Sequence, residues 1–405
     1  MIAPELLAPA GDLERLDTAL YFGADAVYVG GPKLQLRAGS VGFTMDDIAT
    51  AAEKVHAAGK KLYVTVNAFP TDAELDALPD YAQALRDCGA DAAIVADLGA
   101  IAVMRKAAPS LAVHVSTQAN CQNAEAARVY HDMGATRVVL GREMTLEQIA
   151  KFRAKVPTAL ELEAFVHGAM CMAWSGRCML SAYLTGRSAN RGACTQSCRW
   201  TYHLMEEKRP GEFFPIEEDD RGTTILSSHD LCCIEFLDQL MAAGISSFKI
   251  EGRMKSPYYV ATVTNAYRRQ LDALLSHTST PELTAILRRE LDAASHRAYA
   301  SGFYFGAMKK HAPDDGTYLA DCRFVGVVKE RLPGGRVRVE QRNRVRVGDV
   351  LEVLSPNSLG LSFPAARMTD MDGSPIDEAA VPMRRFDIDA PSCVAPGDML
   401  RIRGQ

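Results

Sequence analysis

Four of the ten cysteines in this chain fall within a stretch of 28 residues. They are Cys171, Cys178, Cys194 and Cys198, with gaps of six, fifteen and three residues between them. Structural zinc sites are usually built from tight pairs of the C-x2-C kind. Irregular gaps in a loop are more typical of the thiolates that hold an iron–sulfur cluster. The spacing therefore favours an iron–sulfur site, with structural zinc or unliganded thiols as the alternatives.

The stretch around these cysteines is rich in glycine, serine and arginine and has little apolar periodicity. Core burial cannot order so long a loop, whereas four thiolates on one metal centre would order it. The N-terminal residues MIAPELLAPAGDLERL contain no basic segment followed by an apolar one, as a secretory signal would. No apolar run approaches the ~20 residues of a membrane span. We therefore expect a cytoplasmic protein with reduced thiols and no membrane partner. Cys232 or Cys233 could replace one of the four ligands.

Short apolar runs alternate with amphipathic helical patterns from residue 4 to about residue 275, and these elements must position the cysteine stretch. The predicted strands are Glu5–Ala8, Ala26–Gly30, Leu62–Asn67, Ala92–Ala96, Ala112–Ser116, Arg137–Leu140, Leu160–Val166 and Ser247–Ile250. The predicted helices include Leu13–Tyr21, Met45–Ala58, Asp72–Asp87, Ala124–Met133, Leu146–Ala154 and Leu231–Ala242. Eight such strands indicate an α/β fold, a (β/α)8 TIM-like barrel with the cysteine-rich insertion after strand seven. An open doubly wound sheet is the alternative, but no glycine-rich dinucleotide fingerprint follows the first strand.

Polar residues follow nearly every predicted strand, at the barrel end where catalytic groups of this fold lie. The candidate catalytic residues are Asn67, Asp97, Gln118, Glu163, His167, Lys249 and Glu251. Arg37, Arg142 and Arg253 are the candidates for binding a small anionic co-substrate, because guanidinium groups match carboxylates. The alternatives are structural: Asp97 could cap a helix, and Glu163 could pair with a lysine or arginine that lines the barrel.

The chain has 405 residues and a net charge of −5, so only a local basic patch could attract a polyanion. We expect a catalytic barrel over residues 1–280 that includes an iron–sulfur loop at 168–228, then a helical linker over 281–317. Period-two alternation then predicts a small antiparallel β-barrel domain over 318–405. Five arginines of this domain form a basic stripe that could contact RNA phosphates, or else a solvated face: Arg336, Arg338, Arg342, Arg344 and Arg346.

Four segments resemble the U32 peptidase family: ELLAPAGDLERLDTALYFGADAVYVGG, VHVSTQANCQN, ELEAFVHGAMCMAWSGRCMLS and SFKIEGRMKSPYYVATVTNAYR. The central motif, E-x-F-x-x-G-x-x-C-x6-C-x-x-S, is met by Glu163, Phe165, Gly168, Cys171, Cys178 and Ser181. The motif RGACTQSCRW makes the chain most similar to the tRNA 5-hydroxyuridine synthases of this family. The resemblance covers essentially the whole chain.

This resemblance implies an oxygen-independent hydroxylase that carries a 4Fe–4S cluster and converts the wobble uridine of tRNA to 5-hydroxyuridine, with prephenate as co-substrate. It also implies that Cys171, Cys178 and Cys194 are cluster ligands, with Cys198 favoured over Cys232 as the fourth. A collagenase-like peptidase is the alternative, although the sequence contains neither an HExxH zinc site nor a G-x-S-x-G nucleophile elbow. A hydroxylase of another RNA or of a small aromatic substrate is a second alternative.

Overall fold

A closed ring of eight parallel strands forms the first part of the structure. The computed structural model describes residues 3–36, 42–170, 176, 178–197, 204–205, 213–214, 216–219, 222–225, 229–306 and 319–404. The barrel strands are β1 (Glu5–Pro9), β2 (Ala26–Gly30), β3 (Lys61–Val66), β4 (Ala92–Val95), β5 (Ala112–Val115), β6 (Arg137–Val139), β7 (Glu161–Ala169) and β13 (Ser247–Ile250). Strand β13 pairs in parallel with both β1 and β7, and this pairing closes the barrel. The predicted TIM-like barrel is confirmed.

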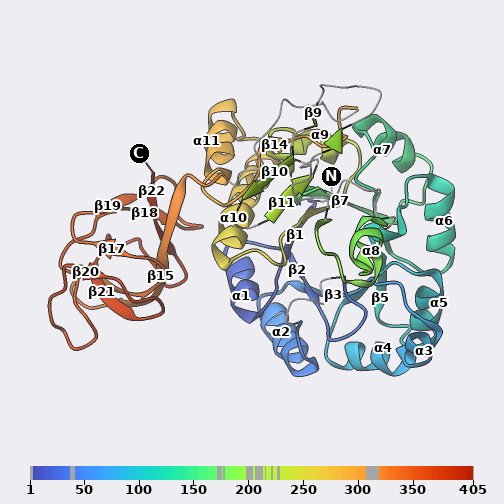
Figure 1. Ribbon diagram of the computed structural model, residues 1–405, viewed down its shortest axis with the longest axis horizontal. Coiled ribbons are helices and arrows are strands. Elements are labelled where there is room, and N and C mark those ends of the chain that lie inside the picture. Colours follow the sequence, from blue (N-terminus) through green and yellow to red (C-terminus); the bar gives the residue numbers. More distant parts are fainter. Residues whose placement is uncertain are drawn as a thin grey trace. The chain divides into compact units, whose positions relative to one another are not determined.

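The strands form where the sequence is apolar on both faces. All five residues of β2 are buried, as are all residues of β4, which is the pattern of parallel strands covered by helices. Figure 1 shows helices placed around the ring. They are α1 (Leu13–Tyr21), α2 (Met45–Ala57), α3 (Asp72–Asp76), α4 (Leu78–Asp87), α5 (Leu98–Ala107), α6 (Ala124–Asp132), α7 (Leu146–Arg153) and α9 (Leu237–Ala242).

Two helix predictions need correction. The helix predicted over Asp72–Asp87 is interrupted between α3 and α4, because Pro79 in the first turn of α4 has no N–H to continue the earlier helix. The helix predicted over Leu231–Ala242 begins only at a 3-10 turn, Ile234–Phe236. The preceding residues form β12 (Asp230–Cys232), which pairs antiparallel with β7. Tertiary pairing therefore overrides the helical periodicity there.

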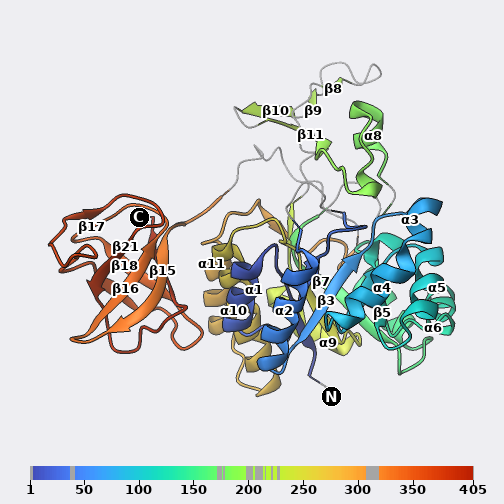
Figure 2. The same cartoon turned by 90° about the horizontal axis from the view of Figure 1, so that it is seen from below.

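Strand β7 is longer than predicted and is the base of the cysteine-rich insertion. It runs to Ala169, where it pairs with Asp230 of β12, and β12 pairs in turn with β14 (Tyr299–Ala300). Between these ends lie α8 (Leu180–Thr185), a 3-10 turn (Ala189–Arg191) and the short strands β8 (Leu204–Met205), β9 (Phe213–Phe214), β10 (Ile216–Asp219) and β11 (Gly222–Ile225). Figure 2 shows α8 beyond one end of the barrel, on the same side as α3.

The chain divides into two compact units. The first comprises residues 1–20, 24–255 and 297–318, and the second comprises residues 21–23, 256–296 and 319–405. Helices α10 (Pro257–Leu275) and α11 (Pro281–Leu291) thus group with the C-terminal sheet, whereas the sequence placed the boundary of the barrel at residue 280. Within the second unit, Tyr258 and Ala261 of α10 share a buried apolar cluster with Val327, Leu354 and Met399.

The C-terminal sheet is antiparallel, as predicted, and curls into a half-barrel. Its strand order is β19-β18-β22-β15-β16-β21. The strands are β15 (Cys322–Leu332), β16 (Arg336–Gln341), β18 (Val350–Leu354), β19 (Ser362–Pro364), β21 (Arg385–Asp389) and β22 (Met399–Arg403), with a separate pair, β17 (Val345–Arg346) and β20 (Glu378–Ala379). Alternating buried residues such as Val337 and Val339 fill its core. Within the described residues, no helix is both long and apolar enough to cross a membrane.

Candidate functional site

The C-terminal end of β7 is where several predicted site residues meet. The amide of Glu251 donates a hydrogen bond to the carbonyl of His167 at 2.9 Å. The His167 ring is completely buried, and its Nε2 lies 3.4 Å from the hydroxyl of Tyr299. Gly168 adopts a φ of +105°, and a Cβ there would lie 2.5 Å from the carbonyl oxygen of Glu251. Only glycine suits this position, three residues before the predicted ligand Cys171, which lies outside the described residues.

Arg142 reaches the same strand end from the loop after β6. Its Nη1 donates to the carbonyl of Ala169 at 2.7 Å, and its guanidinium stacks over the ring of Phe165 at 3.8 Å. Its Nε is buried and has no hydrogen-bond partner. No carboxylate among the described residues pairs with it. An arginine with an unused N–H beside the cysteine-bearing segment is suited to receive a carboxylate.

Arg253 follows β13 and occupies a separate position across the barrel end. Its guanidinium donates to Thr65 Oγ1 at 2.9 Å and to Gln35 Oε1 at 2.6 Å, and only 6% of the residue is exposed. A Cβ on Gly30 would lie 2.3 Å from Arg253 Nη1, so this glycine is required for the arginine to be placed there. Arg37, predicted to act with these arginines, lies outside the described residues.

Two cavities open at this end of the barrel. The larger, about 620 Å³, is lined by Arg253 together with the loop after β1 and residues Gly42 and Phe43. The smaller, about 300 Å³, is lined by Gln35 and Phe69 and by Arg191 of the cysteine-rich insertion. Both lie where ligands of this fold bind, at the carboxyl ends of the strands.

Glu163 and Lys249 contact each other, but inside the barrel. Lys249 Nζ lies 2.7 Å from Glu163 Oε1, and Arg137 Nη1 lies 3.1 Å from Glu163 Oε2. Arg137 also pairs with Glu5 at 2.6 Å. Because Glu5, Arg137 and Ser247 are the first residues of their strands, Glu163 belongs to the amino end of the barrel. Its predicted location at a strand's carboxyl end is wrong, because β7 continues for six residues beyond it.

Within this buried network, the opposite charges of Glu163 and Lys249 stabilise each other's ionised form. Burial alone would raise the pKa of the Glu163 carboxyl, but Lys249 and Arg137 hold it below its ordinary value. Burial lowers the pKa of Lys249, and the carboxylate of Glu163 opposes that effect. Glu163 is completely buried and Lys249 is 4% exposed. The arrangement matches the structural alternative of an ion pair that lines the barrel.

The remaining predicted residues take different roles. Asp97 caps α5 by accepting a hydrogen bond from the amide of Ala100 at 3.0 Å, which is the structural alternative for this residue. Asn67 Nδ2 lies 3.5 Å from Ser116 Oγ, and its buried Oδ1 has no partner. The backbone carbonyl of Gln118 lies so close to Gly176 that a Cβ on that glycine would be 1.9 Å from it. Gln118 therefore touches the cysteine-rich insertion.

The described part of the insertion is attached to the barrel mouth. Arg191 donates to the carbonyl of Phe69 at 2.6 Å and pairs with Glu74 at 3.1 Å. The amide of Phe69 in turn donates to the carbonyl of Asn190 at 3.3 Å. Arg191 lies three residues before Cys194, so these contacts hold the cysteine segment against the loop that follows β3.

Cys178 and Cys194 are free thiols in this segment. Cys194 Sγ accepts a hydrogen bond from the amide of Gln196 at 3.4 Å and one from Ser181 Oγ at 3.9 Å. Such donors stabilise a metal-bound thiolate, so the donor set fits an iron–sulfur ligand. Cys198, like Cys171, is outside the described residues, and within the described residues no three histidine, cysteine or acidic side chains could hold a metal together. Cys232 is buried in β12, opposite His167.

Acidic neighbours compensate the arginine stripe of the C-terminal sheet. Arg336 lies 3.7 Å from Asp389, and Arg338 lies 2.9 Å from Asp387. Arg342 pairs with Glu340 at 2.8 Å. Arg344 and Arg346 share Glu378 at 2.8 and 3.2 Å. Only these last two are more than half exposed, at 57% and 62%, so they are the members best placed for a phosphate.

Comparison with known proteins gives the family. Residues 11–313 match peptidase family U32, and residues 320–401 match the C-terminal domain of the same family. The chain belongs to peptidase family U32. The U32 chain is 38% identical to the tRNA hydroxylation protein P1 of Bacillus subtilis over 404 residues, which cover 98% of this chain and 94% of that protein.

Two further U32 relatives carry different names. The 23S rRNA 5-hydroxycytidine synthase of Escherichia coli is 38% identical over 271 residues, which cover 67% of this chain and 40% of that protein. A protein of Porphyromonas gingivalis named collagenase is 35% identical over 312 residues, which cover 75% of this chain and 73% of that protein. The family match confirms the resemblance seen in the sequence motifs.

Four residues with contacts at the two ends of the barrel were not among the sequence candidates: Arg137 and His114 at the amino end of the barrel, and Gln35 and Tyr299, which contact Arg253 and His167. Arg137 and His114 lie within predicted strands, and a charged or polar residue in a buried strand was a signal that could have found them. Gln35 and Tyr299 gave no such signal, since they lie in segments without a recognisable pattern.

Proposed function

We propose that this protein hydroxylates the wobble uridine of tRNA to 5-hydroxyuridine in a reaction that depends on an iron–sulfur cluster and prephenate and not on molecular oxygen. The observation that carries the proposal is the near full-length similarity to a tRNA hydroxylation protein, across both the barrel and the C-terminal domain. The family match alone would leave the substrate open, because other U32 relatives are named for ribosomal RNA and collagen.

A 4Fe–4S cluster would be held by Cys171, Cys178, Cys194 and Cys198. When bound, such a cluster can accept or donate one electron or act as a Lewis acid. The fit is supported by the hydrogen bonds that Cys194 receives and by the attachment of its segment to the barrel mouth. Ser181, a member of the U32 sequence motif, donates one of these bonds. The protein's own contribution would be to hold the segment that carries Cys194 against the loop after β3, through the hydrogen bond from Arg191 to the carbonyl of Phe69.

The anionic co-substrate would bind beside the end of β7. Arg142 offers a buried Nε–H without a partner, and Asn67 offers a buried acceptor without one. Buried polar atoms without partners are rare in native proteins and commonly mark a ligand or an ordered water. We assign the carboxylate of the co-substrate to Arg142. Arg253, which donates to Thr65 and Gln35, forms the wall of the larger cavity.

The RNA substrate needs one accessible base. Bases of an unpaired anticodon loop can be turned out of their stack at modest cost, so a wobble uridine can enter a pocket at the strand ends. The smaller cavity is lined by Phe69 and by Arg191 of the cysteine-rich insertion, and an aromatic side chain is a suitable stacking partner for a base.

The decisive experiment is nucleoside mass spectrometry of RNA from a deletion strain that carries the wild-type gene, Cys194→Ser or Cys88→Ser. We expect 5-hydroxyuridine in tRNA to be absent from the deletion strain and from Cys194→Ser. It should return with the wild type and with Cys88→Ser, because the Cys88 thiol instead donates to the carbonyl of Met45. The modification should persist in anaerobic culture. Unchanged 5-hydroxyuridine in the deletion strain would refute the proposal.

The same samples test the two alternatives. Loss of a hydroxylated nucleoside from ribosomal RNA and not from tRNA would identify ribosomal RNA as the substrate, as the name of the Escherichia coli relative suggests. Cleavage of gelatin by the purified protein, lost in Cys194→Ser, would support the peptidase suggested by the name of the Porphyromonas gingivalis relative.

A further inference from the structure

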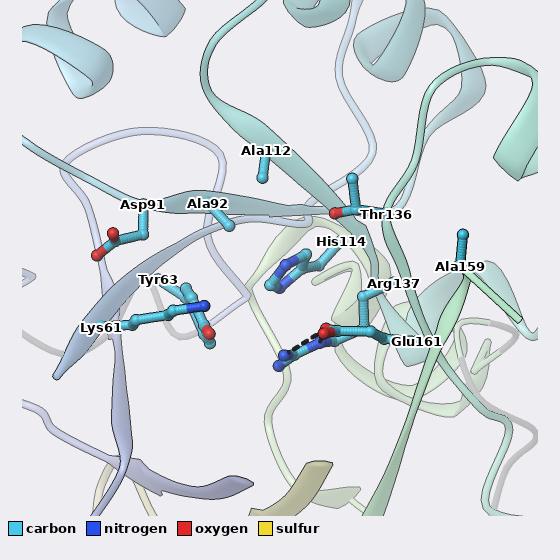
Figure 3. Close-up of a pocket in the computed structure, with 10 residues that line it drawn as sticks. All are labelled: Lys61, Tyr63, Asp91, Ala92, Ala112, His114, Thr136, Arg137, Ala159 and Glu161. Carbon is cyan, nitrogen blue, oxygen red and sulfur yellow. Dashed lines mark hydrogen bonds and ion pairs between the residues drawn. The ribbon is translucent and has the colours of Figure 1, made fainter. Parts of the chain in front are cut away.

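A second kind of cavity lies at the opposite, amino end of the barrel. It has a volume of about 300 Å³, opens to the surface and is lined by residues at or near the beginnings of strands β3 to β7 (Figure 3). Its lining residues are Lys61, Tyr63, Asp91, Ala92, Ala112, His114, Thr136, Arg137, Ala159 and Glu161. None of these residues belongs to the proposed reaction site at the carboxyl ends of the strands.

Small side chains leave this space open. Ala92 of β4 lies in register with Tyr63 of β3 on one side and with Ala112 of β5 on the other. The interior of such a barrel is normally filled by bulky branched side chains in layers. Two alanines at one level therefore create room that the neighbouring tyrosine and histidine do not fill.

Most charged groups of the cavity wall already have ionic partners. Arg137 pairs with Glu161 at 2.6 Å and also with Glu5. The Asp91 carboxylate accepts one hydrogen bond from the amide of Leu62 at 2.8 Å, and its Oδ2 lies 3.0 Å from His56 Nε2. Lys61 is the exception, because its ammonium pairs with no acidic side chain among the described residues. One cation of the wall therefore remains available to a ligand.

His114 is the second unsatisfied group. Only 4% of the residue is exposed, its Nδ1 has no hydrogen-bond partner, and the ring meets that of Tyr63 edge to face at 4.7 Å. In Figure 3 the imidazole lies within the ring of lining side chains, between Tyr63 and Arg137. Burial lowers the pKa of His114, and the positive charges of Arg137, Lys249 and Lys61 lower it further. A neutral imidazole in a positive field is a hydrogen-bonding group suited to an anion.

We propose that this amino-end cavity is a binding site for a small oxyanion, a carboxylate or a phosphate, recognised by the Lys61 ammonium and the His114 imidazole. A buried nitrogen without a partner is costly to a protein, so a ligand or a set of waters is expected to satisfy it. The unpaired ammonium at the rim favours an anion over neutral solvent. At about 300 Å³ the cavity lies at the lower end of the size range of small-molecule sites, which suits a compact anion. The site is independent of the proposed tRNA hydroxylation.

The test is titration of the purified full-length protein with inorganic phosphate and, separately, with succinate, followed by calorimetry and by the NMR signals of histidine imidazoles. Lys61→Met removes the charge, and Ala112→Leu fills the cavity while leaving every polar group of the wall in place. Lys60→Met is the matched control, because the adjacent Lys60 pairs with Asp25 and does not line the cavity.

We expect saturable binding of at least one probe, with a shift of the His114 imidazole signal. Tighter binding of phosphate would identify the natural ligand as a phosphate, and tighter binding of succinate would identify it as a carboxylate. Lys61→Met should weaken binding about tenfold or more, as loss of a charge-assisted hydrogen bond does. Ala112→Leu should abolish it, and Lys60→Met should leave it unchanged. The proposal is overturned if neither probe binds saturably, or if binding survives both Lys61→Met and Ala112→Leu. Because hydroxylation of tRNA is measured separately, either proposal can fail without the other.

Discussion

Replacing Glu163 by Gln tests whether this buried carboxylate is structural or chemical. The Glu163 side chain is completely buried, 2.7 Å from Lys249 and 3.1 Å from Arg137. Glutamine preserves the volume but leaves the Lys249 charge in the barrel without its counter-ion. Breaking a buried ion pair from one side typically costs about 3–5 kcal/mol, a large part of a total stability of about 5–15 kcal/mol. We therefore expect a marked fall in the free energy of unfolding.

Urea unfolding followed by circular dichroism measures this loss as a lower midpoint at unchanged slope. The double variant Glu163→Gln with Lys249→Met should recover much of the stability, because it removes both charges and the two effects are not additive. Glu147→Gln is the matched control: it breaks a surface pair with Lys151 and should leave the midpoint unchanged. A Glu163→Gln protein that keeps its midpoint yet loses hydroxylation would refute the structural role and make Glu163 part of the chemistry.

Three further predictions concern ligands, RNA and pH. Arg142→Gln should raise the half-saturating concentration of prephenate about ten- to a hundredfold in a hydroxylation assay, since a charge-assisted hydrogen bond contributes about 1.5–3 kcal/mol; an unchanged value removes Arg142 from the site. Reversing Arg344 and Arg346 to Glu should weaken tRNA binding and reduce its log–log salt dependence by ~0.7–0.9 per lost phosphate contact, and a constant slope would show that they make none. His114 has a lowered pKa when folded, so the folded state binds fewer protons than the unfolded one below pH ~6.5. Stability should therefore fall as pH drops below ~6.5, and His114→Phe should reduce that fall between pH ~6.5 and ~5.

The eight barrel strands could be predicted because each is a short, mostly apolar run, and β2 and β13 begin and end where the sequence indicates. The end of β7 could not, because it is determined by an antiparallel partner about sixty residues further along the chain. Without that partner, the sequence from Glu161 onward shows no reason to continue beyond Val166. The misplaced position of Glu163 and the false helix at Leu231 both follow from this one long-range pairing.

The basic stripe shows a similar limit. Arg336 and Arg338 share a strand face, as the alternation predicts. Their acidic partners, Asp389 and Asp387, lie on β21, about fifty residues later, so the compensation of charge is visible only in the folded sheet. Local composition predicts which side chains share a face, but net charge on that face depends on what pairs across it.

The pairing of Ala169 with Asp230 has a consequence for how the protein can change its length. Because the insertion leaves and re-enters the sheet at two directly paired residues, its ends are held together by the barrel and not by its own contents. The entropy of closing such a loop grows only slowly, by ~0.6 kcal/mol for each doubling of length. Insertions or deletions between these residues should therefore leave barrel formation almost unaffected. The cysteine-bearing segment could thus be lengthened, shortened or exchanged, in evolution or by design, while the barrel itself stays unchanged.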